Sequence, residues 1–465
     1  MGQKLDRKLG VTGIIFMVVA AAAPITVVVA NFPIVIGESG SVGAPLMVLA
    51  ATIILLLFSV GYAWMTPHVP DAGAFYSYVD RGLGKHTGLG TAAIALFSYV
   101  LLTVSMTCYL GVQAGNLIRL WTGAELPWWL ISAVMIVIVG FLGYRDIELS
   151  AKVLGTVLVC EIIAVLTIDL GVLFSGSELA STPFSPAEAL SGAPGLGLLF
   201  AFLGFFGFEA TAVFRNEAKD PERTIPRATY IAVASIGLLY FLSSWLVIVG
   251  LGVDQAVAAS TDNPDNVIIA LAGHVVAPIV ADIAQVLVVT SMFACMLAFH
   301  NIVTRYLFTL GERGVLPQNL ANVHPKHNAP SKASLWVSLI TSVVVGVSAL
   351  AMLDPVVQIY TWYSGAGAVG VIAMMALTSF AVVRFGSKAS SHPANTGVKV
   401  CAVAGGLGLL LVLVISLWYF PVMVGSTAAA FVWGGALIVA FLIGAGFARR
   451  VEAESSLAQL STPAG

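Results

Sequence analysis

Long apolar runs, separated by short stretches of charged and turn-forming residues, repeat from one end of the sequence to the other. Many of these runs reach 18 residues or more, and about 20 apolar residues in a helix cross the hydrocarbon core of a bilayer. The polar breaks predict twelve membrane helices, at about residues 11–36, 43–66, 87–114, 127–144, 149–174, 194–215, 226–252, 275–306, 331–352, 355–384, 397–419 and 425–448. We therefore predict an all-α polytopic membrane protein in a lipid bilayer.

The composition supports this class. Of the 465 residues, 59% are hydrophobic and 9% are charged, whereas a soluble domain has about 25% charged residues. The mean hydropathy of the chain is +0.98. So few charged groups could not keep this much apolar surface in water, which excludes a series of soluble domains.

Lys and Arg occupy alternate segments between the predicted helices. Of the 21 basic residues, 20 fall on one side of the membrane and Arg119 alone falls on the other. Acidic residues gather on that second side, at Glu178, Glu188, Asp254, Asp262 and Asp265. Because cytoplasmic loops hold the excess of Lys and Arg, we expect both termini in the cytoplasm and the chain in the cell membrane.

Other functional classes lack their characteristic residues. The net charge is −2 without a basic tract, so we expect no nucleic-acid partner. The four cysteines lie inside apolar runs and form no CxxC pair, which indicates neither a disulfide framework nor a thiolate zinc site. The sequence has no phosphate-binding loop, no HExxH and no GxSxG. We therefore expect a transporter without cofactor or metal, and not an enzyme.

Glu161 is the most informative charged group inside a predicted helix. It lies near the middle of the fifth helix, with no other acidic or basic residue within seven positions on either side. Polar groups inside a membrane are costly and therefore indicate function. Burial favours the protonated form of a carboxyl group, which can then exchange a proton near neutral pH. Glu161 is thus a candidate for proton coupling; a permanently protonated carboxyl that bonds a neighbouring helix is the alternative.

The remaining polar groups in the helices have simpler interpretations. Asp169 and Asp282 are expected near the outer ends of their helices, where water is within reach. Arg305 lies near an inner end and can extend to the interface. His300 is expected to form a hydrogen bond between packed helices.

Two predicted helices contain breaks. In the first, Pro24 follows four alanines and removes a backbone hydrogen bond. In the sixth, Gly204 and Gly207 lie three residues apart beside Glu209. Such breaks are tolerated against protein or a water-filled cavity, where freed backbone groups bind ligands. The first and sixth helices hold matching positions in two halves of five helices. This match favours a shared site over the alternatives of a proline kink and a glycine packing face, and we predict that both helices are discontinuous.

Three further segments carry motifs. Residues 70–78 read PDAGAFYSY; GFEA at 207–210 is followed by NEAKDPERTIPRA at 216–228; and residues 305–317 run from RYLF to RGVLP. Together they resemble the motifs of the amino acid–polyamine–organocation (APC) superfamily of secondary transporters, with Arg313 where the family usually has an acid. The resemblance covers about residues 10 to 385.

The resemblance implies the LeuT-type fold, in which a ten-helix core of two inverted five-helix repeats precedes two peripheral helices. On this chain it implies a cytoplasmic segment at 1–10, a core at 11–385 with repeats at about 11–174 and 194–384, peripheral helices at 397–448, and a short cytoplasmic tail at 449–465.

The chain departs from the family at the first break. Family members that bind an α-carboxylate usually have a glycine-rich turn there, and this chain has Ala22-Ala23-Pro24-Ile25. Pro24 has no N–H, so donors to a carboxylate would come from Ala22, Ala23, Ile25 or Thr26.

Two more departures bear on the substrate lid and on the coupling ion. The aromatic lid that is common in the sixth helix is Leu203 here, and Phe205 or Phe206 is expected to replace it. Near Cys295, sodium-coupled relatives of the fold carry hydroxyl groups. A thiol is a poor ligand for sodium, which favours protons as the coupling ion.

The predicted substrate site lies at mid-membrane between the two breaks. Its residues are Ala22, Ala23, Ile25, Thr26, Phe205, Phe206, Gly207, Phe208 and Glu209. Glu209 would pair with a substrate ammonium group or hold the two breaks together. Glu217, Lys219 and Arg223, which follow the sixth helix, are expected to form ion pairs of an inner gate.

We therefore expect proton-coupled uptake of an amino acid or related amine by alternating access. A polyamine or organocation carrier and a substrate/product exchanger are alternatives within the same class. A transporter-like nutrient sensor is the alternative from another class, and its mark would be a long cytoplasmic tail.

Overall fold

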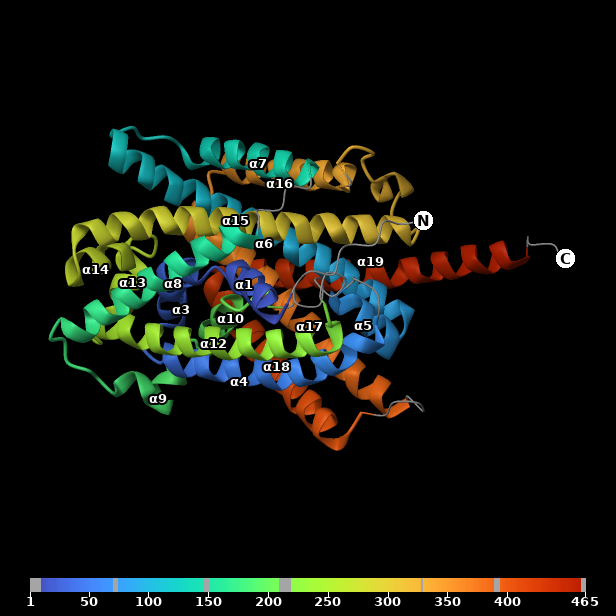
Figure 1. The fold of residues 1–465 in the computed structure, drawn as a ribbon, viewed down its shortest axis with the longest axis horizontal. Helices are drawn as coiled ribbons and strands as arrows, with labels where there is room; N and C mark the ends of the chain where they lie inside the picture. The colour runs from blue at the N-terminus through green and yellow to red at the C-terminus, as the bar shows by residue number, and fades with distance from the viewer. Residues whose placement is uncertain are drawn as a thin grey trace.

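A computed structural model describes residues 10–69, 74–145, 151–208, 219–327, 329–388 and 394–460 (Figure 1). These residues are mostly helical and contain no strand, which confirms the all-α prediction. The first half of the chain forms α1 (Val11–Ala21), α2 (Pro24–Thr26), a π-helical turn (Val27–Asn31), α3 (Phe32–Ser39), α4 (Ala44–Met65), α5 (Ala74–Leu83), α6 (Lys85–Thr122), α7 (Trp128–Tyr144), α8 (Ala151–Phe174), α9 (Pro186–Ala189) and α10 (Pro194–Leu203).

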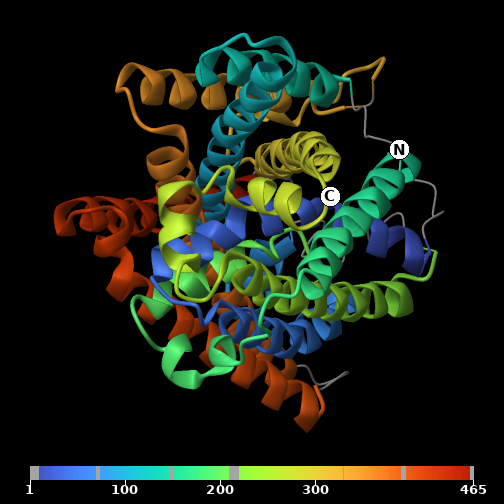
Figure 2. The same cartoon turned by 90° about the vertical axis from the view of Figure 1, so that its left-hand side faces the viewer.

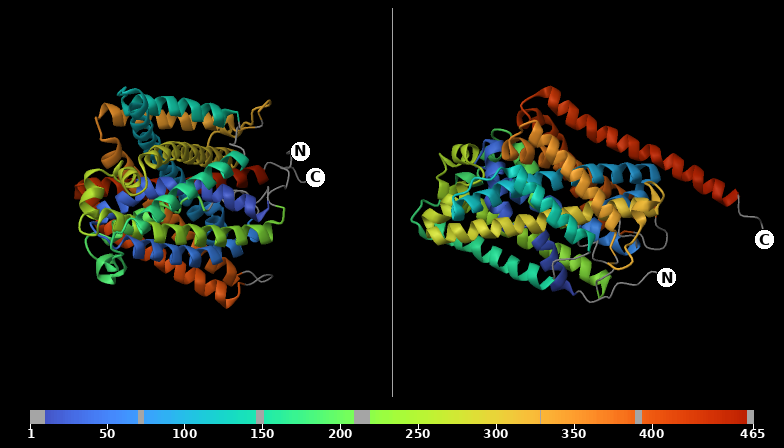
Figure 3. Two further views of the ribbon diagram at one scale, coloured as in Figure 1. Left: turned by 60° about the vertical axis from the view of Figure 1, so that its left-hand side comes forward. Right: turned by 90° about the horizontal axis from the view of Figure 1, so that it is seen from above.

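The second half continues the helical bundle. It forms α12 (Pro221–Leu251), α13 (Ala256–Asp262), α14 (Val267–Val275), α15 (Pro278–Glu312), α16 (Ser331–Leu350), a π-helical stretch (Pro355–Tyr363), α17 (Ser364–Lys388), α18 (Thr396–Met423) and α19 (Thr427–Leu460). α19 extends beyond one end of the bundle, and α13 and α14 lie at the other end (Figures 1 and 3).

Length and composition mark many of these helices as membrane spans. Within the described residues, nine helices are long and apolar enough to cross a bilayer. Three shorter apolar helices, Pro24–Ser39, Trp128–Tyr144 and Pro194–Leu203, lie at the other positions where the sequence predicts a crossing. The chain is therefore a multi-pass membrane protein, while the count of twelve crossings and the inverted repeats stay predictions.

Contacts between loops define one end of the bundle. The Arg313 guanidinium, just after α15, lies 3.5 Å from the Asp80 carboxylate of α5. The Ser331 hydroxyl at the start of α16 donates to the carbonyl oxygen of Tyr144 at the end of α7, at 2.7 Å. The sequence assigns these segments to the same, basic side of the membrane.

A second set of contacts defines the opposite end. The Gln113 side-chain amide of α6 donates to the carbonyl oxygen of Asp265 in the loop before α14, at 2.8 Å. The Ser41 hydroxyl, between α3 and α4, donates to the carbonyl oxygen of Glu188 in α9. Basic and acidic loops thus separate to opposite ends, as the alternation of charge along the sequence predicts.

The middle of the bundle contains the interrupted first span and α10. Every side chain from Ala22 to Ile36 is buried, as are most of those of α10. Figure 2 looks along the bundle from the end of α13 and α14 and shows α7 and α16 as a pair on its outside. Small residues allow the core helices to approach closely. A Cβ added at Gly367 of α17 would lie 3.0 Å from the Ser98 carbonyl oxygen of α6.

Candidate functional site

The first interruption lies at Ala22 and Ala23. α1 ends at Ala21, and Ala23 adopts a φ of +49°, a left-handed conformation that is uncommon for residues other than glycine. Pro24 then begins the next helix, where its missing N–H costs nothing. The apolar helix that starts there runs from Pro24 to Ser39 through the π-helical turn. The sequence places this break correctly because proline and its neighbours act locally.

Protein groups already occupy part of the backbone that this break exposes. The Tyr240 hydroxyl of α12 donates to the carbonyl oxygen of Ala22 at 3.2 Å. The amide of Ala22 donates to the Val18 carbonyl oxygen, and the amide of Ile25 donates to the Glu161 carboxylate at 3.5 Å. Of the donors predicted for a substrate carboxylate, the amides of Ala22 and Ile25 are therefore engaged. The Thr26 hydroxyl is buried and has no hydrogen-bond partner among the residues that the structure describes.

The second interruption follows α10. The chain leaves the helix after Leu203 and turns through residues 204–208, and Gly207 has a φ of +110° that favours glycine. Glu209 and Glu217 lie outside the described residues, so their predicted roles stay predictions.

The three phenylalanines predicted to cap the substrate point in different directions. The Phe206 side chain lines the cavity between the two interruptions. The Phe205 ring packs edge-on against Tyr240, with centroids 5.6 Å apart. The Phe208 ring packs edge-on against Phe58 of α4 at 6.0 Å. The structure thus brings Phe206 alone of the three to the cavity.

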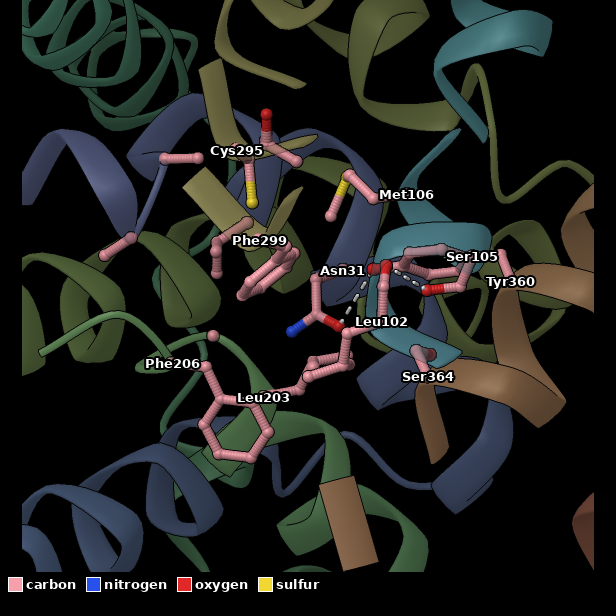
Figure 4. Close-up of a pocket in the computed structure, with 15 residues that line it drawn as sticks. Asn31, Leu102, Ser105, Met106, Leu203, Phe206, Cys295, Phe299, Tyr360 and Ser364 are labelled. Atoms are coloured by element: carbon pink, nitrogen blue, oxygen red, sulfur yellow. Dashed lines mark hydrogen bonds between the residues drawn. The ribbon is translucent and has the colours of Figure 1, made fainter. Parts of the chain in front are cut away.

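The cavity between the two interruptions is small. Its volume is about 30 Å³, whereas pockets for small ligands measure about 300–1,000 Å³. Its lining comes from both interruptions and from α6, α15 and α17 with the preceding π-helical stretch: Ala22, Ala23, Thr26, Val27, Asn31, Leu102, Ser105, Met106, Leu203, Gly204, Phe206, Cys295, Phe299, Tyr360 and Ser364 (Figure 4). A substrate of amino-acid size requires the surrounding helices to move apart.

Four polar side chains of the lining were not singled out from the sequence: Asn31, Ser105, Tyr360 and Ser364. The Asn31 amide donates to the Phe200 carbonyl oxygen at 2.8 Å, and its side-chain oxygen accepts from the Tyr360 hydroxyl at 3.5 Å. The Ser364 hydroxyl is buried, and no described residue forms a hydrogen bond with it. Asn31 interrupts the apolar run from 27 to 36, which is a signal that could have marked it. Among the described lining residues none is charged.

Glu161 lies behind the first interruption and does not line the cavity. Its side chain on α8 is 2% exposed, and its carboxylate accepts the Ile25 amide at the start of the Pro24–Ser39 helix. A negative charge is favourable at this helix N-terminus. The neighbouring helix α15 packs against α8, and its Cys295 lines the cavity.

Other polar side chains of the spans form hydrogen bonds to neighbouring helices or are partly exposed. The Asp169 carboxylate accepts a hydrogen bond from the Ser243 hydroxyl of α12 at 2.6 Å. The His300 ring pairs with the Ser334 hydroxyl of α16 at 2.9 Å, which is a bond between packed helices. Asp282 lies near the start of α15 and is half-buried, and its place near the outer surface stays a prediction.

The predicted inner-gate residues include one local ion pair. Lys219 is exposed, and the Arg223 guanidinium lies 3.9 Å from Asp220, three residues away. Exposed pairs of this kind contribute about 0–1 kcal/mol. The Asp80–Arg313 pair is different because it joins α5 to the turn after α15, with Arg313 4.9 Å from the Tyr76 ring centroid. The basic residue at 313, which departs from the family motif, therefore has an acidic partner elsewhere.

Comparison with known proteins gives one consistent result. The model of a family described as "Amino acid permease" matches residues 9–446. The branched-chain amino acid permease BcaP of Bacillus subtilis (strain 168) is 24% identical over 399 residues, covering 80% of this chain and 79% of that protein. The aromatic amino acid transport protein AroP of Escherichia coli (strain K12) is 25% identical over 300 residues, covering 62% and 63%. The low-affinity putrescine importer PlaP of the same strain is 22% identical over 352 residues, covering 74% and 75%.

Proposed function

This chain belongs to the amino acid permease family of the APC superfamily, and from that premise we propose that it is a proton-coupled carrier of an apolar amino acid. The family consists of transporters and not enzymes. Membership of the family specifies neither the coupling proton nor the substrate. Separate features of the geometry support our choice of each.

One contact carries the coupling proposal: the hydrogen bond from the Ile25 amide to the Glu161 carboxylate. The ionised carboxylate accepts this bond and faces the positive end of the Pro24–Ser39 helix. Protonation removes the charge and weakens the attachment, by roughly 1–2 kcal/mol for a charged hydrogen bond at a helix end. A change of that size shifts a two-state equilibrium about tenfold.

The proton on Glu161 would therefore change how firmly the interrupted first span is held to α8. Because α15 packs against both α2 and α8, and its Cys295 lines the cavity, a shift of the first span also changes the cavity walls. In this scheme protonation from outside favours an arrangement in which the cavity is open, and release of the proton inside favours its closure. The small volume of the cavity supports such alternation, because a substrate fits only after the helices separate.

The lining favours an apolar side chain on the substrate. Leu102, Met106 and Phe299 provide aliphatic and aromatic walls, and the described lining contains no charge. The Thr26 hydroxyl, to which no described residue is hydrogen-bonded, would donate to a substrate carboxylate. The substrate ammonium group would bind freed carbonyl groups and Glu209. The names of two relatives, a branched-chain and an aromatic amino acid carrier, agree with this choice.

The membrane arrangement belongs to the same proposal. We propose twelve crossings, two inverted five-helix repeats, both termini in the cytoplasm and residence in the cell membrane. The separation of basic and acidic loops to opposite ends supports this orientation.

Uptake into liposomes that contain the purified protein tests the function. Labelled leucine, phenylalanine and putrescine are offered with and without an inwardly directed proton gradient. We expect accumulation of leucine or phenylalanine that depends on the gradient. Accumulation of putrescine alone would replace the proposal with a polyamine carrier, in line with the similarity to PlaP. Exchange without net accumulation would contradict proton coupling.

A further inference from the structure

A second and larger cavity lies at the end of the bundle where α13 and α14 lie, and we call it the outer pocket. Its volume is about 700 Å³, which is within the usual range for small-ligand sites. Its polar wall residues come from α6, from the loop between α13 and α14, and from α15: Asn116, Arg119, Asn263, Asp265, Asn266, Asp282 and Gln285. It shares no lining residue with the central cavity.

Buried side-chain hydrogen bonds fix the walls of the outer pocket relative to one another. The Gln285 amide donates to the side-chain oxygen of Gln113 at 2.7 Å and to its backbone oxygen at 3.1 Å. Gln113 in turn donates to the Asp265 carbonyl oxygen at 2.8 Å. Gln285 is 5% exposed and Gln113 is fully buried. These hydrogen bonds thus hold three separate segments together around the outer pocket.

The charges of the outer pocket are unbalanced. Asp282 is half-buried and forms no hydrogen bond or ion pair with any described residue. The Asp265 carboxylate accepts one hydrogen bond, from the Asn116 amide at 3.2 Å. The Arg119 guanidinium at the rim lies 3.9 Å from Glu125, and both side chains are more than 60% exposed. Two partly buried carboxylates therefore face one exposed and already paired cation, and such carboxylates favour a positively charged partner.

We propose that the outer pocket binds a small organic ammonium ion, separately from the central cavity and from the proposed coupling. Asp282 supplies the ionic partner, and Asp265 and the amides of Asn266 and Gln285 accept further N–H groups. An inorganic cation fits less well, because the described residues contain no cluster of three or more His, Cys, Asp or Glu and the pocket is far wider than one ion. A free amine and a zwitterionic amino acid both carry the ammonium group. The Arg119 guanidinium can in addition donate hydrogen bonds to the carboxylate of the amino acid, which the free amine lacks.

Calorimetric binding to the full-length protein in lipid nanodiscs tests the proposal, with putrescine, leucine and calcium chloride as probes. We expect a binding component for putrescine or leucine that weakens about tenfold in Asp282→Asn, the effect of losing one charged hydrogen bond. Asp262→Asn is the matched control, since Asp262 is an exposed acid at the same end that does not line the outer pocket. If leucine is the ligand, Arg119→Gln also weakens leucine binding relative to the wild type. If putrescine is the ligand, Arg119→Gln leaves its binding unchanged.

Two results would overturn the outer pocket as an ammonium site. One is an isotherm for Asp282→Asn that superimposes on those of the wild type and Asp262→Asn. The other is calcium binding that depends on Asp282 and displaces the organic probe. A second variant, Asn266→Trp, fills the pocket from an exposed wall position and is expected to remove the same component. Calorimetry does not require transport, so an inactive carrier leaves this test intact, and failure of the outer pocket leaves the function of Glu161 unaffected.

Discussion

Two carboxyl groups are buried on α8, and the helix holds them against different kinds of partner. Glu161 is 2% exposed and Asp169 is 5% exposed. Asp169 accepts a hydrogen bond from the Ser243 hydroxyl, inside the continuous helix α12. Glu161 accepts one from the Ile25 amide, at the start of a helix that begins after an interruption. The two side chains are similarly buried, but Asp169 binds a side-chain hydroxyl, whereas Glu161 binds a backbone amide at a helix N-terminus.

This difference separates a packing carboxyl from a candidate coupling carboxyl. A change at Asp169 alters one side-chain bond between two long helices. A change at Glu161 alters the hold on a helix whose N-terminal end also borders the central cavity, through Ala23 and Thr26. Tyr240, which donates to the Ala22 carbonyl oxygen, and Ser243, which donates to Asp169, lie three residues apart on α12. Neighbouring positions of one helix thus contact the first interruption and the Asp169 carboxylate. For these two carboxyl groups, the bonding partner indicates the role more than the degree of burial does.

The largest effect is expected from exchanging each carboxyl for an amide. A proton gradient of one pH unit drives about tenfold accumulation for each coupled proton, because a tenfold ratio corresponds to about 1.4 kcal/mol. We expect Glu161→Gln to reduce accumulation in liposomes to the ratio without a gradient, while leucine binding persists. Asp169→Asn is the matched control and should retain most of the accumulation. Equal losses in both variants would break the distinction between the two carboxyls.

A smaller effect is expected at the hydroxyl that donates to the first interruption. Tyr240→Phe removes the donor to the Ala22 carbonyl oxygen while keeping the ring that packs on Phe205. Loss of one such bond costs about 0.5–1.5 kcal/mol, so we expect a roughly three- to tenfold change in the uptake rate. Initial rates of gradient-driven uptake measure this. A wild-type rate would show that the carbonyl group at the interruption does not need this partner.

The smallest effect on transport is expected at Ser243, although stability should fall. Within the described part of the chain, Ser243→Ala leaves the buried Asp169 carboxylate without a hydrogen-bond donor, at a cost of roughly 1–3 kcal/mol. We expect the thermal midpoint to decrease by a few degrees, about the shift that such a cost produces in a large domain. Uptake at a temperature well below the midpoint should be unchanged. Strong loss of uptake without loss of stability would assign Asp169 to the mechanism.

The sequence alone predicts the features that local chemistry determines. Helical spans follow from apolar runs, and the interruptions follow from Pro24 and from Gly204 and Gly207, whose backbone properties do not depend on distant residues. Glu161 is identifiable because it is isolated in an apolar segment.

Side-chain direction at the site is set by distant residues and could not be predicted. Phe205 and Phe206 are neighbours in the sequence, but the Tyr240 ring of α12 holds the first away from the cavity. Asn31 and Ser364 enter the lining only because three separate segments pack together. In the same way, the partner of Arg313 is Asp80, more than 200 residues earlier.

Proton movement that accompanies substrate entry tests the central claim most directly. Liposomes containing the protein and a pH-sensitive dye are given external leucine without an imposed gradient, and the internal pH is followed. We expect the interior to acidify when leucine is added to liposomes with the wild-type protein. We expect no acidification with Glu161→Gln, although this variant should still exchange labelled for unlabelled leucine. Leucine entry without acidification in the wild type, or acidification that persists in Glu161→Gln, would contradict the central claim.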